Sequence, residues 1–126
     1  MKWLISFFTS SIGRKVIMSL TGLFLCMFLV VHLAGNLQLL KDDEGYAFNT
    51  YTYFMTHNPL IKFISYFTYF FILLHAIQGV MLSVYNRRAK GKGYAVKTNA
   101  NASLASKNMA LLGILILAFL IMQLKQ

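Results

Sequence analysis

The fold of this chain is decided by residues 16–40, which read VIMSLTGLFLCMFLVVHLAGNLQLL. These 25 residues contain no charged side chain. A helix rises about 1.5 Å per residue and the hydrocarbon core of a bilayer is about 30 Å thick, so this run is long enough to cross it. Its apolar character is continuous rather than alternating, which excludes a transmembrane strand. The stretch therefore predicts a membrane-spanning helix.

Two further runs lack charged residues, residues 63–86 and 108–124, of 24 and 17 residues. The first of these is long enough to span a bilayer comfortably and the second only just. With 58% hydrophobic and 12% charged residues among 126, the chain is too apolar for an ordinary soluble domain. We therefore predict an all-α membrane protein, a single transmembrane domain over residues 1–126 with three transmembrane helices.

The segments outside these runs predict shorter elements. The residues before Arg14 include Trp3, Phe7 and Phe8, are too few to span a bilayer, and predict a short interfacial helix. The link between the first two spans is rich in tyrosine and phenylalanine, which predicts a helix or loop at the outer headgroup level, with Pro59 opening the second span. The polar, basic link of residues 86–106 predicts an exposed loop.

The distribution of charge predicts the orientation. Nine of the twelve basic residues precede the first span or lie between the second and third, whereas all three acidic residues lie between the first and second. The nine are Lys2, Arg14, Lys15, Arg87, Arg88, Lys90, Lys92, Lys97 and Lys107. The positive-inside rule therefore places the N-terminus in the cytoplasm and the C-terminus outside. The net charge of +9 suits anionic lipid or an acidic cytoplasmic partner, and no nucleic-acid motif accompanies it.

Two histidines, His32 and His75, lie inside the apolar runs. An ionisable side chain at membrane depth is costly and marks a functional site, here most simply a pair of haem ligands. Gly35 and Gly79 follow them by three and four residues, and leave a side-chain-free patch on each face that suits either a flat macrocycle or close helix packing. A bond to a neighbouring helix, or a proton relay, is the alternative for both histidines. His57, in the outer link, is predicted to be a solvated loop residue.

Depth along the helices indicates whether the two histidines share one iron. His32 lies 17 residues after Lys15, and position 123 lies 16 residues after Lys107, so both are about 25 Å along their helices. His75 lies 12 residues before Arg87, about 7 Å nearer the cytoplasm by the same rise. We therefore predict that His32 and His75 do not bind the same iron and that each needs its own partner.

Several motifs in this order resemble the cytochrome b subunit of succinate dehydrogenase, in the single-chain b558 form of bacteria that use menaquinone. The likeness extends over essentially the whole chain. Its motifs are Ser10-Ser11-Ile12-Gly13-Arg14-Lys15, Met18, Thr21-Gly22-Leu23, His32-Leu33-Ala34-Gly35-Asn36-Leu37, Asn58-Pro59-Leu60, His75 with Gly79, Asn86-Arg87-Arg88-Ala89, Tyr94-Ala95 and Ser106-Lys107-Asn108-Met109.

The resemblance implies a five-helix haem-binding bundle in the bacterial inner membrane. It implies two b haems, with His32 an axial iron ligand of the outer haem and His75 of the inner one. Electrons would arrive from flavoprotein and iron–sulfur subunits on the cytoplasmic face and reduce quinone, while succinate is oxidised on the other subunits. Gln78, on the His75 face, is expected to pack between helices, or else to bond a propionate or the second nitrogen of His75.

This chain departs from the family pattern in two places. Gln123 stands where the resemblance implies the histidine partner of His32, and an amide binds haem iron weakly, so the outer haem is expected to be absent, weakly bound or five-coordinate. The adjacent Met122 offers a thioether but points about 100° away around the helix. The fourth and fifth spans are missing, so we expect an N-terminal part of a longer protein. The alternatives are a three-helix anchor sharing one haem with a second chain, and a haem-free proton-coupled transporter fragment.

Overall fold

The computed structural model describes residues 1–91 and 103–125, and every regular element within these ranges is a helix. The chain divides into two compact units, Met1–His75 and Ala76–Gln126, and each is considered by itself. The all-helical prediction is confirmed for the described residues. The prediction of a single transmembrane domain stays a prediction.

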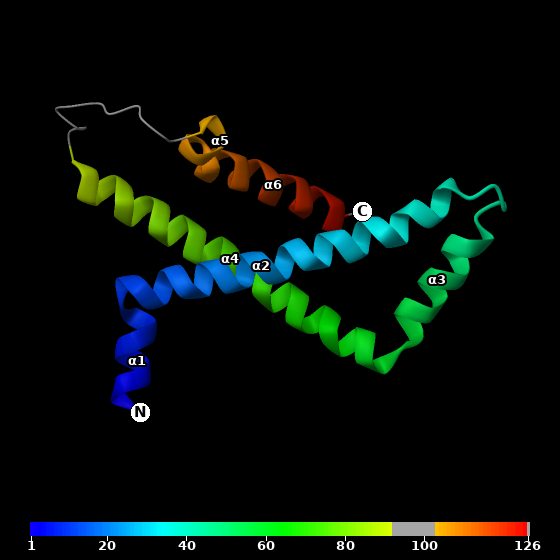
Figure 1. Ribbon diagram of the computed structural model, residues 1–126, viewed down its shortest axis with the longest axis horizontal. Coiled ribbons are helices and arrows are strands. Elements are labelled where there is room, and N and C mark those ends of the chain that lie inside the picture. The colour runs from blue at the N-terminus through cyan, green and yellow to red at the C-terminus, as the bar shows by residue number, and fades with distance from the viewer. Residues whose placement is uncertain (92–102, 126) are drawn as a thin grey trace. The chain divides into compact units, whose positions relative to one another are not determined.

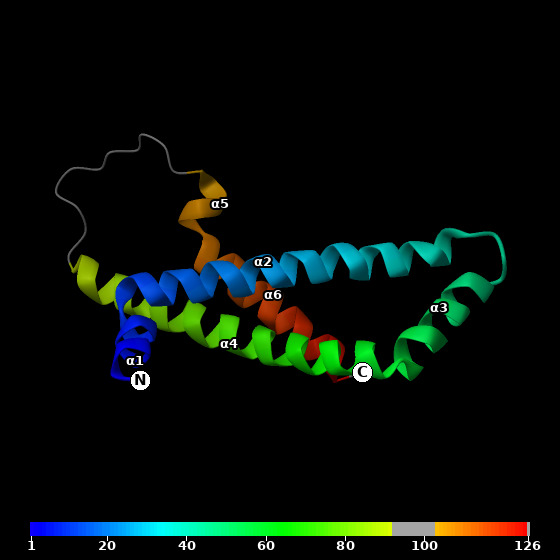
Figure 2. The ribbon, with the colours of Figure 1, turned by 60° about the horizontal axis from the view of Figure 1, so that its bottom comes forward.

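The first unit begins with a short helix set across the start of a long one (Figure 1, Figure 2). α1 spans Lys2–Thr9 and α2 spans Ser11–Asn36. Ser10 separates them in an extended conformation, and its hydroxyl accepts from the Gly13 amide at 3.0 Å and donates to the Phe7 carbonyl at 2.6 Å. A Cβ on Gly13 would collide with that same carbonyl oxygen, so this tight junction requires glycine.

The link between α2 and the second long helix is largely helical, which is one of the two forms that its aromatic residues predicted. α2 continues into the 3₁₀ helix η1, Leu37–Leu40, and α3 spans Tyr46–His57. Between them Glu44 and Gly45 both have positive φ, of 55° and 83°. The Asp43 carboxylate accepts from the Gly45 amide at 3.1 Å and from the Ala47 amide at 2.9 Å, which satisfies donors at the start of α3.

The second long helix, α4, spans Pro59–Lys90 and begins at the proline, as predicted. The Asn58 side chain accepts from the Leu60 amide at 2.9 Å and thereby caps the helix. In the second unit α5 spans Leu104–Lys107 and α6 spans Met109–Leu124. The loop predicted for residues 86–106 is wrong at both ends, because α4 runs on to Lys90 and α5 begins at Leu104; residues 92–102 lie outside the described residues.

The spans predicted from charge-free runs agree with the helices in position but not in length. The stretches long and apolar enough to cross a bilayer are Ser11–Leu40 and Pro59–Ala89, each longer than its charge-free run. Charged residues such as Lys15 and Lys62 are good helix formers, so they mark the edge of an apolar run without ending the helix. The third predicted span is the 16-residue α6, about 24 Å long and shorter than a bilayer core.

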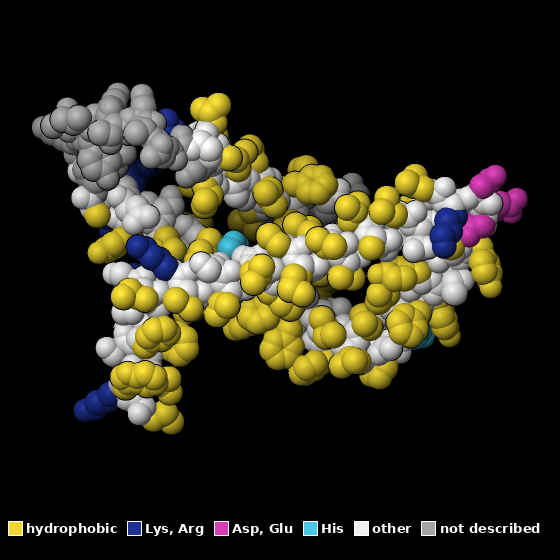
Figure 3. Space-filling model, in the orientation of Figure 1, with side chains coloured by type: hydrophobic (Ala, Val, Ile, Leu, Met, Phe, Trp, Pro, Cys, Tyr) yellow, Lys and Arg dark blue, Asp and Glu magenta, His cyan; other side chains and the backbone are white. Residues whose placement is uncertain are grey.

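The long helices expose their apolar side chains. Among the described residues no hydrophobic side chain is buried, and only 6% of the most apolar window of each long helix is covered. Figure 3 shows hydrophobic side chains along α2, with the acidic residues gathered in the link that follows it. A core helix of a soluble protein would be covered on most of one face.

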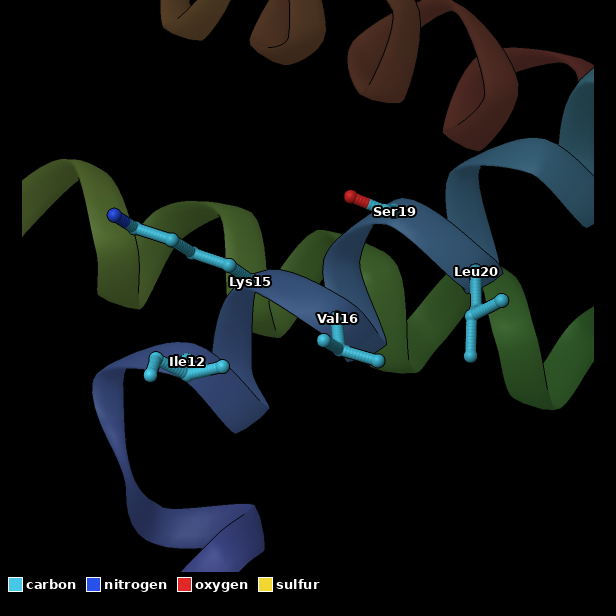
Figure 4. Close-up of a pocket in the computed structure, with 5 residues that line it drawn as sticks. All are labelled: Ile12, Lys15, Val16, Ser19 and Leu20. Atoms are coloured by element: carbon cyan, nitrogen blue, oxygen red, sulfur yellow. The ribbon is translucent and has the colours of Figure 1, made fainter.

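One depression on this surface lies along a single face of α2 (Figure 4). Ile12, Val16 and Leu20 form an apolar row, flanked by Lys15 and Ser19, around a space of about 280 Å³. The residues are four apart, so the row is a helix ridge and its groove rather than a set of converging polar groups. We therefore treat it as part of the exposed apolar surface.

Candidate functional site

One stripe of α2 meets the first half of α4. Ile17, Thr21, Phe24 and Phe28 follow one another at helical spacing, and Phe24 packs against Phe71 of α4 with ring centroids 4.7 Å apart. One turn nearer the start of α2, Thr21 contacts His75. The side chain of Thr21 is only 4% exposed, the same value as that of Thr68 on α4. The helix pair therefore buries hydroxyl groups while its outward apolar side chains stay uncovered.

His75 is held at this contact by one hydrogen bond and one close approach. Its Nδ1 lies 2.9 Å from the Thr21 Oγ1, which is the only hydrogen bond of its side chain within the described residues. The ring also packs on Gly22, where an added Cβ would lie 3.0 Å from Cε1 and 3.9 Å from Nε2. The ring edge of His75 thus fits onto a position of α2 that has no side chain.

An apolar groove of about 410 Å³ lies beside this contact. It is lined from α2 by Ile17, Leu20, Thr21 and Phe24, and from α4 by Phe71 and Leu74. Thr21 is the sole polar member of the lining, and its hydroxyl is engaged with the backbone and His75. The groove beside the imidazole is therefore apolar except for the hydroxyl group that holds the ring.

His32 lies on the same stripe of α2 but in a different environment. Its side chain is exposed, and its ring stacks on Phe28 at 5.3 Å between centroids. At Gly35 the Tyr51 ring of α3 occupies the side-chain-free patch: an added Cβ would lie 2.6 Å from Tyr51 Cε1. Gly35 therefore serves close packing of α3 on α2, the alternative that the sequence left open. The corresponding expectation for Gly79 stays a prediction.

His32 is far along α2 from the point at which His75 of α4 contacts that helix. His75 is level with Thr21, which precedes His32 by eleven residues, or about 16 Å of helix. A metal–imidazole bond is about 2 Å long, so the two rings do not reach one metal ion. That they do not bind the same iron stays a prediction, and the offset exceeds the expected 7 Å. A count along each helix does not fix where two helices meet, and the observed offset is set by the contact of His75 with Thr21.

The remaining candidate residues lie in the second unit. Gln123 and Met122 are both exposed on α6, and their pairing with His32 stays a prediction. The Gln78 Oε1 atom is buried without a hydrogen-bond partner among the described residues, and the second nitrogen of His75 is bonded by Thr21 instead. No cluster of three His, Cys, Asp or Glu side chains occurs in residues 1–91 and 103–125. Axial ligation of haem needs no such cluster.

His57 is exposed, as expected, but it is not a loop residue. It ends α3, where its Nδ1 donates to the Tyr53 carbonyl at 2.9 Å and its ring stacks on Tyr53 at 4.0 Å. A histidine in the last turn of a helix commonly bonds a terminal carbonyl in this way. His57 therefore has a local structural role.

Thr21 and Gly22 were not among the residues predicted to form a site. They lie about 9 Å along α2 from Lys15, whereas His75 lies about 18 Å along α4 from Arg87, so a count of depth does not pair them. The available signal was a threonine within an apolar stripe at positions 17, 21, 24 and 28, followed by a glycine. A buried hydroxyl on a helix contact face needs a partner, and histidine can be one.

Comparison with known proteins gave no further guide, since no protein-family model, no curated protein and no solved structure matches this chain.

Proposed function

We propose that α2 and α4 cross a lipid bilayer. The support is their length together with their exposure: large apolar side chains such as Leu29, Val30 and Phe70 are more than half exposed over helices of 26 and 32 residues. In water such a surface would cost about 25 cal/mol per Å² of apolar area, whereas lipid tails solvate it. Reporter fusions in the link at residues 41–45 and after residue 91 test this, and the proposal requires them to report opposite sides.

We further propose that the chain is a haem-binding membrane anchor of a succinate dehydrogenase type of complex, which serves electron transfer to quinone. The observation that carries this proposal is the His75 imidazole, held by Thr21 against Gly22 between two long apolar helices. The motifs that resemble the cytochrome b subunit supply the class of complex and its partners, flavoprotein and iron–sulfur subunits on the cytoplasmic face. Anchoring them suits the basic residues expected there.

The residues around His75 fit a haem. Imidazole is a common axial ligand, the groove beside the Thr21–His75 contact is apolar, and Gly22 carries no side chain that would crowd the ring at Cε1. A haem bound there would supply one-electron transfer. The chain's own part is to orient the ring through Thr21, to exclude water with Phe24 and Phe71, and to keep the surroundings of low polarity, which are the means by which a protein adjusts a haem potential.

His32 supports a second candidate arrangement. Its ring is exposed, so a ligand opposite it can come from another chain as well as from Gln123. An exposed His32 is compatible with a three-helix anchor that shares one haem with a second chain. The two arrangements differ in the number of haems bound per copy of this chain.

Reduced-minus-oxidised absorption spectra of the purified native-length complex test the proposal. We expect b-type bands in the wild-type protein, complete loss of one component in His75→Ala, and a separate effect on any second component in His32→Ala. His57→Ala is the matched control, because that histidine is exposed and, in the part of the chain that the structure describes, is bonded only within α3. A colourless wild-type complex would refute the proposal and favour a proton-coupled transporter.

A further inference from the structure

The direction of the Thr21–His75 hydrogen bond follows from the other bonds of the threonine. The Thr21 Oγ1 lies 2.7 Å from the Ile17 carbonyl oxygen and 3.2 Å from that of Met18. Carbonyl oxygens only accept, so the single hydroxyl proton points to them. The oxygen that faces His75 Nδ1 at 2.9 Å can then act only as an acceptor.

A neutral imidazole carries one N–H, and here it must be on Nδ1. The other nitrogen, Nε2, then bears the lone pair, which is the form that binds a metal. We infer that Thr21 is a positioning residue that fixes the tautomer and orientation of His75 so that Nε2 is the free donor atom. The inference rests on the proposed function for the identity of the ligand, haem iron, but not for the state of the ring.

The surroundings of Thr21 strengthen the preference of His75 for the Nδ1–H tautomer. Thr21 is only 4% exposed, so water does not compete for its hydroxyl oxygen. The threonine side chain is restricted at χ1 by its branching, and its donor bond to the preceding turn fixes the rotamer further. The ring edge of His75 lies on Gly22, which limits its rotation. A partner that fixes one imidazole nitrogen in this way also raises the basicity of the other as a ligand.

The state of the ring can be measured without haem. The full chain, labelled with ¹⁵N-histidine and produced in haem-starved cells, is purified in detergent, and His75 is assigned by comparison with His75→Gln. Protonated and lone-pair ring nitrogens have well-separated ¹⁵N shifts. We expect Nδ1–H in the wild type and in Thr21→Ser, and a mixture of tautomers in Thr21→Val. A wild-type His75 protonated on Nε2, or a Thr21→Val spectrum like that of the wild type, would overturn the inference.

The consequence for ligation is measured by haem titration of the same proteins. Loss of a residue that orients a ligand typically weakens metal binding by about 10- to 100-fold, and we expect that loss in Thr21→Val with recovery in Thr21→Ser. Thr68→Val is the matched control, because Thr68 is equally buried and, among the described residues, its hydroxyl bonds only the Ile64 carbonyl. Equal losses in Thr21→Val and Thr68→Val would reduce Thr21 to a packing residue and contradict the inference.

The proposed haem-binding function and the inference about Thr21 are contradicted by different results. If the wild type binds no haem but His75 is protonated on Nδ1 in a Thr21-dependent way, the proposed function is wrong and the inference about the ring stands. If haem binds at His75 with equal affinity in all threonine variants, the function stands and the inference is overturned. Thr21→Ser keeps the test usable should Thr21→Val fail to fold.

Discussion

His75 contacts the stripe of α2 on which His32 lies, but the two histidines are held in opposite ways. His75 is fixed by a buried hydroxyl and rests on a glycine of the facing helix, so its orientation is decided within this chain. His32 is exposed, and within residues 1–91 and 103–125 its ring stacks only on Phe28 of its own helix. The two histidines have nearly the same apolar context in the sequence. Such a context therefore does not by itself predict that a histidine is held in one orientation.

The largest expected effects come from alanine substitutions at two glycines, which test the difference between the two histidines. An alanine Cβ at Gly22 would crowd His75, and one at Gly35 would crowd Tyr51. We expect overpacking to cost about 1–3 kcal/mol at either position, against about 1 kcal/mol gained in helix propensity, so both variants lose stability in detergent. Only Gly22→Ala should also lower the His75 haem signal.

Gly113→Ala on α6 is the control for the glycine variants, because no atom lies within 4 Å of its added Cβ. It should show the gain in helix propensity without the crowding. If Gly35→Ala were to reduce the His75 haem signal as much as Gly22→Ala does, the surroundings of the two glycines would be coupled. The contrast drawn between His75 and His32 would then be wrong.

The hydrogen bond of Thr21 gives a smaller effect on stability. Thr21→Val removes the acceptor of the His75 Nδ1–H with little change in shape, and a bond of this kind contributes about 1 kcal/mol net. We expect thermal unfolding of the haem-free chain to show that loss for Thr21→Val. Thr68→Val should be within about 0.5 kcal/mol of wild type, and a larger loss there would mean that hydroxyl burial rather than the bond to His75 is what matters.

The smallest effect is expected at Phe28. Phe28→Leu removes the ring that stacks on His32, an interaction worth about 0.5 kcal/mol at a partly exposed site. We expect faster motion of the His32 ring in ¹⁵N relaxation and an unchanged His75. A His32 ring that stays equally rigid would show that another contact holds it, and the contrast between the two histidines would weaken.

Much of the fold followed from local pattern. The long helices, the start of α4 at Pro59 and the helical outer link were predictable, because proline, apolar run length and interfacial aromatics act through the nearby backbone and solvent. The end of α4 was not predictable, because charged residues were taken as helix ends. The size of the offset between the histidines was not predictable either, because it depends on where α2 and α4 meet. The site partner of His75 was missed because pairing across helices depends on where they touch.

The sequence by itself determined that this chain is helical, apolar along two long segments, and equipped with two histidines at different levels. Those properties follow from backbone geometry and from the cost of placing charge in an apolar medium. Only the tertiary structure decided that Thr21 and Gly22 face His75 while Tyr51 fills the place at Gly35. Such contacts depend on the crossing of α2 with its neighbours, and the same apolar stripe is compatible with many crossings.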